Sequence, residues 1–190
     1  MKRKHILTAA LLALAASLAP AGARQAAEKA ASPAQQKPEG LVQMEKLQLL
    51  VGTWSYTETW EKSAFTPNGS SGPGTYEARI GPGGYSLVID FTTHASFGDE
   101  IGHGILTWDP KEKTYKEYIV GNAFPGCAIF TGHWEGDLLV FEGEFEGGGK
   151  KTTLKTTYTE WTPKSITILE YYRAGDAPFQ LLQTTKATKP

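Results

Sequence analysis

Residues 47–60 read LQLLVGTWSYTETW and join a short apolar run to an alternating one. The apolar run at 47–51 predicts a short helix that ends at Gly52, because a glycine permits the sharp turn that must follow. From residue 53 onward every aromatic side chain falls on one face, and small hydroxyl residues occupy the other. A period of two is typical of a strand with one buried face. We therefore expect the helix to plug one end of a β-barrel, with Trp54 lying across its floor.

The rest of the chain repeats this alternation, with turn residues about every eight to twelve positions. No segment after the plug shows a convincing helical period, and the links are too short for parallel crossovers. The sequence thus predicts an all-β fold, a ten-stranded antiparallel up-and-down β-barrel with a short N-terminal plug helix. The expected strands lie near residues 53–62, 74–80, 84–94, 100–108, 113–121, 126–134, 137–145, 150–161, 164–173 and 178–187.

The links between these strands differ between the two ends of the predicted barrel. Links after even-numbered strands are tight turns, whereas links after odd-numbered strands are longer and rich in Gly and Pro. Trp54, Trp108, Trp134 and Trp161 all fall at the tight-turn end, and Trp60 falls at the other. We expect the four indoles to seal this end, the base, and any ligand to enter among the loops of the opposite end, the mouth.

The N-terminus has the pattern of an export signal. Three basic residues at 2–4 precede an apolar run at 6–18, which is too short to span a bilayer as a helix. A small-residue cleavage site follows, so residues 1–23 are predicted to be a signal peptide, with an uncleaved anchor as the alternative. Residues 24–40 are predicted to be a disordered linker, and residues 41–188 a single barrel domain. The expected location is outside the cytoplasm, either periplasmic or secreted.

Charge and cysteine content narrow the classes of partner. The 190 residues have a formal net charge of −1, which gives no electrostatic reason to expect nucleic acid or an anionic membrane. The single cysteine, Cys127, excludes an internal disulfide. We expect Cys127 to be a small, buried or half-buried apolar residue, with a reactive thiol as the alternative.

Three short motifs occur in order along the predicted barrel. A Leu-rich segment leads into Gly52-Thr53-Trp54, a Trp-Asp-Pro turn lies at 108–110, and a Gly-x-Trp-x-Gly-Asp turn lies at 132–137. With the meander they resemble the calycins, and most closely a domain-of-unknown-function family of lipocalin-like exported bacterial proteins. The resemblance covers about residues 41–188 and implies the barrel, but no reaction, ligand or cofactor. It also implies that a basic residue from the last strand packs over the floor tryptophan, and Lys186 is the expected residue.

The predicted inner faces supply a candidate ligand site. Glu58 shares the inward face of Trp60, and because a buried carboxylate needs a partner, Arg173 on the ninth strand is the expected one. The residues expected to contact a small, mostly apolar ligand are Glu58, Trp60, Phe91, His103, Tyr171 and Arg173. Further inward residues are expected to be Tyr56, Leu87, Ile89, Leu154, Tyr158 and Leu169.

Other functions remain open at this point. Glu58 or His103 could serve as an acid or base at the mouth of a small-molecule enzyme, or aromatic side chains could fill the barrel and leave an interaction module. His103 stands between Gly102 and Gly104, which would admit a flat haem, and with His94 it could bind zinc. No metal-ligand, nucleophile-elbow or phosphate-loop motif occurs, so no catalytic residue, metal or cofactor is predicted.

Overall fold

The computed structural model describes residues 36–190, apart from residues 65, 148 and 149. The predicted signal peptide and most of the predicted linker therefore lie outside the described residues. No helix in the described part of the chain combines the length and apolar character needed to cross a membrane.

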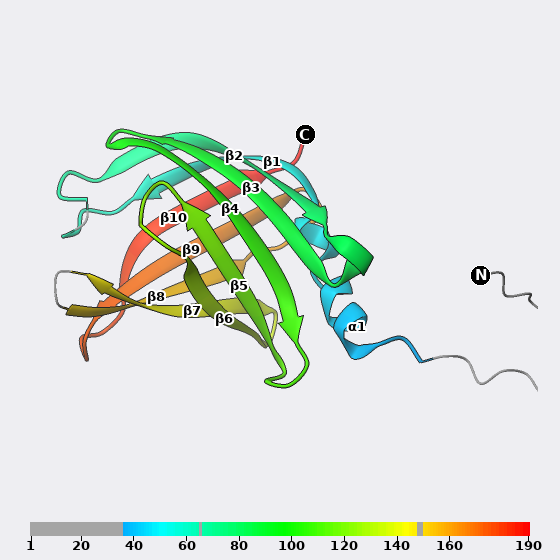
Figure 1. Ribbon diagram of the computed structural model, residues 1–190. Coiled ribbons are helices and arrows are strands. Elements are labelled where there is room, and N and C mark those ends of the chain that lie inside the picture. Colours follow the sequence, from blue (N-terminus) through cyan, green and yellow to red (C-terminus); the bar gives the residue numbers. More distant parts are fainter. Residues whose placement is uncertain (1–35, 65, 148–149) are drawn as a thin grey trace, which may run out of the picture. The chain divides into compact units, whose positions relative to one another are not determined.

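The described chain forms the predicted closed antiparallel barrel (Figure 1). Each strand pairs with its neighbours in sequence, and β1 closes the ring by pairing with β10, with Glu58 opposite Thr185. The strands are β1 Gly52–Trp60, β2 Ser70–Ile80, β3 Ser86–Ala95, β4 Gly98–Asp109, β5 Thr114–Gly121, β6 Ala128–Glu135, β7 Leu138–Gly147, β8 Lys150–Thr159, β9 Ser165–Ala174 and β10 Gln180–Thr188.

A helical segment covers one end of the barrel, as Figure 1 shows. It consists of α1, Glu39–Glu45, and the 3-10 turn η1, Gln48–Leu50; a second 3-10 turn, η2, Pro82–Gly84, joins β2 to β3. The α-helix thus begins earlier than the run at 47–51 suggested, inside the range predicted as a linker. Met44, Leu47 and Leu50 form an apolar stripe along this segment and are almost fully buried. The burial of this stripe explains why the segment packs against the end of the barrel.

The base contains the four predicted tryptophans. Trp54 is 0% exposed, donates its indole N–H to the Leu50 carbonyl at 2.8 Å and stacks on Tyr76 at 5.7 Å between ring centroids. The other three pack against the same core: Trp108 meets the ring of Tyr115 at 5.0 Å, and Trp134 meets Trp161 at 5.7 Å. Trp60 instead meets Phe97, in the link between β3 and β4 at the mouth.

The basic residue over the floor tryptophan is Lys189 and not Lys186. The Lys189 ammonium lies 4.5 Å from the centroid of the Trp54 ring and donates hydrogen bonds to the carbonyls of Leu49 and Val51, at 2.9 and 2.7 Å. Lys186 is exposed, because Thr185 and Ala187 occupy the inward positions of β10 on either side of it. The prediction for Lys186 was wrong because it took the last basic residue within the strand, whereas the residue that folds back under the floor follows the strand end.

The mouth is less uniform than the link lengths suggested. The longer links there run over residues 61–69, 122–127 and 175–179, but β3 and β4 are joined through only two residues, Ser96 and Phe97.

Cys127 is exposed, which corrects the expectation of a buried or half-buried thiol. Phe124, in contrast, is half-buried and meets Phe145 at 6.4 Å.

Several inward aromatic rings lie directly against a glycine on the neighbouring strand. The cross-strand pairs are Tyr56 with Gly74, Phe91 with Gly102, and Phe141 with Gly132. At each of these glycines an added Cβ atom would collide with the ring of the partner. The glycines therefore let large rings lie flat on the barrel wall, as aromatic side chains do when they cover strand glycines.

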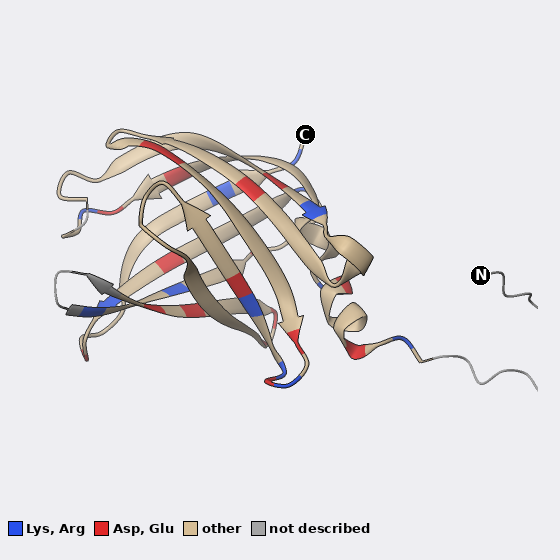
Figure 2. Cartoon of the chain, in the orientation of Figure 1, with Lys and Arg blue, Asp and Glu red and all other residues tan. Residues whose placement is uncertain are grey.

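Charged residues are interspersed along the strands and turns (Figure 2). Glu142 and Glu144 on β7 are exposed, as their alternation with inward Phe141 and Phe145 predicted. Glu144 also pairs with Lys151 on β8 at 2.8 Å. The outer wall of the barrel is thus an ordinary solvated surface at these positions.

Candidate functional site

The barrel encloses two adjoining cavities, which together make the candidate site. The base-side cavity, about 180 Å³, reaches down to Leu50 and Tyr76. The mouth-side cavity, about 390 Å³, reaches the β5–β6 link at Asn122–Phe124. The two share wall residues from six strands, namely Glu58, Phe91, Ile119, Phe130, Glu170 and Gln183. The interior is therefore hollow at its centre, which disagrees with the alternative of a fully packed barrel.

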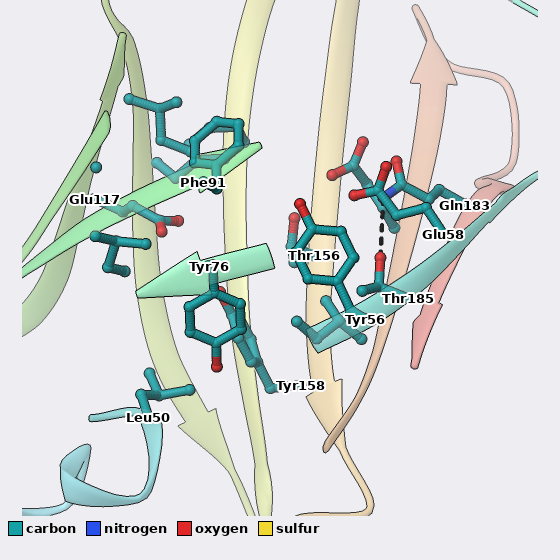
Figure 3. Close-up of a pocket in the computed structure, with 16 residues that line it drawn as sticks. Leu50, Tyr56, Glu58, Tyr76, Phe91, Glu117, Thr156, Tyr158, Gln183 and Thr185 are labelled. Carbon is teal, nitrogen blue, oxygen red and sulfur yellow. Dashed lines mark hydrogen bonds between the residues drawn. The ribbon is translucent and has the colours of Figure 1, made fainter. Parts of the chain in front are cut away.

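Three tyrosines from three strands stand around the base-side cavity (Figure 3). Tyr56 shares a hydrogen bond with the Thr93 hydroxyl at 2.7 Å, and burial raises the pKa of Tyr56 to about 12. The Tyr76 hydroxyl is buried and has no hydrogen-bond partner in the described structure. Burial also raises the pKa of Tyr76 and of Tyr158, so all three phenols stay protonated at neutral pH.

Glu58 projects from β1 into both cavities, beside Gln183 and Thr185 of β10 (Figure 3). Its side chain is only 8% exposed, and Oε2 has no hydrogen-bond partner among the described residues. Burial, with a smaller contribution from the nearby Glu100 carboxyl, raises the pKa of Glu58 to about 7, and hydrogen bonding by Thr93, Trp60 and Gln183 opposes the rise. At neutral pH this carboxyl is thus poised between its neutral and charged forms.

Three more carboxyl groups line the cavities, one each from β4, β5 and β9. Burial raises the pKa of Glu117 to about 7 and likewise that of Glu170, where the Glu58 carboxyl adds to the effect. Burial also raises the pKa of Glu100. No ion pair joins any of the four acids to a basic side chain in the described part of the chain. The site is therefore an apolar, aromatic chamber with an excess of acid.

Sequence reasoning missed Glu117 and Glu170, because acidic residues in strands are usually solvated. One signal could have identified Glu117. It alternates with Tyr115 and Ile119, two apolar residues whose shared face is buried, while Lys116 lies on the other face. In a strand, a charged residue in phase with the buried face points inward whatever its own preference.

Arg173, the predicted partner of Glu58, points to the outside of the barrel. Ile168 and Glu170 face the cavity from β9, so Leu169, Tyr171 and Arg173 face outward. The Arg173 guanidinium stacks on the ring of Phe179 at 4.5 Å. The prediction that Leu169, Tyr171 and Arg173 point inward was therefore wrong, because it assigned the two faces of β9 the wrong way round.

An exterior cluster accounts for the outward β9 residues. The Lys155 ammonium lies over the rings of Tyr171 and Phe179, at 5.4 and 4.9 Å, and the Arg173 guanidinium lies over Phe179. Such contacts between cations and aromatic faces stabilise side chains at a surface. No ion pair between Glu58 and Arg173 forms in the described structure.

His103 also lies outside the barrel. Its side chain is 67% exposed and its Nδ1 pairs with Asp90, which in turn pairs with Arg79. Gly102 and Gly104 face inward on either side of it. Because successive residues of a strand point to opposite faces, His103 must then point away from the lumen. His103 lines neither cavity, so the prediction that it contacts a ligand inside the barrel is wrong. Among the residues that the structure describes, no group of His, Cys, Asp and Glu could hold a metal ion.

The remaining predicted contacts do face the cavities. Trp60 lines the mouth-side cavity, and Phe91 lines both. Leu154 and Tyr158 of β8 and Ile89 of β3 also face inward, and Leu87 belongs to the core. Of the six predicted ligand contacts, the structure brings together Glu58, Trp60 and Phe91.

Comparison with known proteins adds to the fold only. No family model and no curated protein matches the chain. Among solved structures, Rv2717c from M. tuberculosis is 14% identical with a TM-score of 0.56, over 80% of this chain and 98% of that one. A redesigned β-barrel, mFAP0, bound to DFHBI is 18% identical with a TM-score of 0.42, over 75% of this chain and 100% of that one.

The S-type phycobiliprotein lyase CPES from Guillardia theta is 9% identical with a TM-score of 0.49, over 80% of this chain and 96% of that one. Because this score and that of mFAP0 lie below 0.5, neither likeness bears on function. The likeness to Rv2717c is one of barrel fold.

Proposed function

We propose that this protein binds a small, mostly apolar molecule inside its barrel and admits it through the mouth. The observation that supports the proposal best is the pair of adjoining cavities, of about 180 and 390 Å³, within a barrel whose base is filled by indoles and the helical segment. Binding sites for small molecules are typically concave and apolar with a few placed polar groups. Trp60, Phe91 and Phe130 supply the apolar wall here, and Glu58 and Gln183 supply polar groups.

The position of the mouth-side cavity supports entry from the loop end. Its lining includes Ile101, which is exposed at the start of β4, and the β5–β6 link. At the opposite end Trp54, Leu47 and Leu50 are 0–2% exposed and close the route. A ligand that enters beside Phe124 would meet Glu58 at the junction of the two cavities.

A cavity-filling variant tests the proposal directly. Ala128→Leu adds a side chain on the inward face of β6, in the wall of the mouth-side cavity. We expect the neutral fluorescent probe N-phenyl-1-naphthylamine to bind the wild-type protein and to bind the variant about 10-fold or more weakly, because the added side chain occupies part of the cavity that the probe would fill. Probe fluorescence measures both affinities, and native mass spectrometry identifies any molecule that co-purifies.

The matched control is Ile129→Leu, which changes the exposed neighbour of Ala128 on the outer face. It should leave probe affinity unchanged, and both variants should keep the circular dichroism spectrum of the wild type. Thr152→Leu repeats the filling from β8. The proposal fails if no apolar probe binds the wild-type protein, or if the filling variants bind the probe as well as the control does.

One observation favours a second candidate, an enzyme that uses Glu58. A buried carboxyl with a pKa near neutral and a free oxygen is a suitable general acid or base. This candidate requires turnover of the bound molecule that Glu58→Gln abolishes, which the ligand found by mass spectrometry would allow us to measure.

Export remains part of the proposal, on the evidence of the N-terminal sequence pattern alone. Its test is the N-terminal sequence of the mature protein in a bacterial host, for which the expected first residue is Arg24. An unprocessed chain in the cytoplasm would contradict it.

A further inference from the structure

In the described part of the barrel, acidic side chains line the two cavities without a matching basic one. Neither cavity is lined by a Lys, Arg or His in the described part of the chain, whereas four glutamates line them. Basic side chains are available nearby, but Arg173 and Lys155 face outward and stack on exterior rings. A buried carboxyl without a counterion is costly, and proteins normally satisfy it with a cation or with hydrogen bonds.

Glu58 is the acid whose position points to a ligand. Its side chain is more than nine-tenths buried, and its unpartnered Oε2 belongs to a group that lines both cavities. Its neighbours on β10, Gln183 and Thr185, hydrogen-bond to each other at 3.0 Å (Figure 3). One acceptor of Glu58 therefore remains available at the junction of the cavities.

We propose that the lumen selects a small organic cation, with its ammonium or guanidinium group paired to Glu58 and its apolar body in the mouth-side cavity. This inference rests on the proposed function and specifies the class of ligand. The wall around the junction suits such a group, because the faces of Tyr56, Phe91 and Trp60 attract a desolvated cation as well as an apolar chain. Glu100 and Glu170 add negative potential at the same place.

The alternative within the same site is a neutral ligand that accepts a hydrogen bond from protonated Glu58. The two classes respond to pH in opposite directions. A permanent cation binds the ionised carboxylate, so binding expels a proton and affinity rises as pH rises through the pKa of Glu58, about 7. A neutral acceptor needs the protonated form, so its affinity falls over the same range.

Several titratable groups share this chamber and contribute to the pH response. They line the two cavities together with Glu58: Tyr56 on β1, Tyr76 on β2, Glu100 on β4, Glu117 on β5, Tyr158 on β8 and Glu170 on β9. The tyrosines keep their protons at neutral pH, and the three further acids titrate in the same direction as Glu58.

The test uses one carbon skeleton with three head groups: 4-phenylbutylamine, 4-phenylbutan-1-ol and 4-phenylbutyrate. Calorimetric titration of the purified full chain at pH 6 and pH 8 gives the affinity of each. We expect the amine to bind most tightly and its affinity to rise about 10-fold from pH 6 to pH 8, following the ionised fraction of a group with a pKa about 7. The alcohol should bind more weakly, and the butyrate least.

Glu58→Gln keeps the shape and removes the charge, and should weaken amine binding about 10-fold or more at pH 8. It should leave the alcohol unchanged. Glu142→Gln, on the exposed face of β7, is the matched control and should alter neither.

The outcomes separate the two proposals. If the alcohol binds as tightly as the amine, or amine affinity falls with rising pH, the cation inference is wrong while ligand binding stands. If none of the three binds and the apolar probe also fails, both are wrong. Should Glu58→Gln not fold, the pH series on the wild-type chain still decides the question.

Discussion

Trp54 and Glu58 lie on the same strand and the same inward face, four residues apart, yet their surroundings differ in kind. Every polar need of Trp54 is met: its N–H reaches the Leu50 carbonyl, and Lys189 covers its ring. Glu58 is nearly as buried, but one of its oxygens has no partner and other acids surround it. The surroundings of Trp54 favour stability, whereas those of Glu58 leave an unmet electrostatic demand, as binding sites commonly do.

The largest expected effect is at the base. Trp54→Ala should lower the free energy of unfolding by roughly 3–5 kcal/mol, because it leaves a cavity under a fully buried indole. Trp60→Ala, at the half-exposed mouth, should cost less. Urea unfolding followed by circular dichroism measures both. Equal losses would remove the distinction between base and mouth.

The acids of the lumen predict an unusual dependence of stability on pH. Glu117 and Glu170 have a pKa raised to about 7 in the folded chain, against about 4.5 unfolded, so the native state holds more protons between these values. Stability of the empty protein should therefore be highest near pH 5 and fall as pH rises to 7. One such group accounts for roughly 3 kcal/mol.

Glu117→Gln should reduce the loss of stability between pH 5 and pH 7 by the contribution of one carboxyl group. Glu142→Gln, at an exposed position, should leave that loss unchanged. Urea unfolding at pH 5 and at pH 8 measures the slope. A wild-type protein that is more stable at pH 8 than at pH 5 would contradict the arrangement of acids described above.

The smallest expected effect concerns the lysine under the floor. Lys189→Ala should cost about 1–2 kcal/mol, since it removes two hydrogen bonds to the carbonyls of Leu49 and Val51 and a contact with the Trp54 ring. Lys186→Ala, on the exposed face of β10, should stay within about 0.5 kcal/mol of the wild type. Thermal unfolding ranks the pair, and the reverse order would assign the floor role to Lys186 after all.

The architecture could be predicted from the sequence because it depends on patterns that repeat. Period-two alternation locates strands, turn residues separate them, and the four tryptophans beside tight turns mark the base. The helix was misplaced because the buried stripe of Met44, Leu47 and Leu50 extends from α1 to η1, and only its second half lies in the apolar-rich segment at 47–51.

The candidate site was harder, since it depends on which face of a strand points inward. In β9, Ile168 and Leu169 are equally apolar, so neither indicates which face is buried. The charge of Glu170 suggests that its own face is solvated, which would wrongly turn Tyr171 and Arg173 inward. The inward phase is set by pairing with β10 and β8, which a single strand does not reveal. The inward placement of His103 was wrong for a related reason. Glycines flank it on both sides, and a glycine has no side chain that would indicate which face of the strand is buried.

Two of the glycines beneath aromatic rings affect the width of the lumen although neither of them lines a cavity. A methyl group at Gly74 or Gly102 would collide with the ring of Tyr56 or Phe91, which line the cavities, and would push that ring off the wall. The bore could therefore be narrowed step by step while every visible contact residue stays the same. Related barrels with identical wall residues would then accept molecules of different girth, and their selectivity would be recorded at positions that have no side chain.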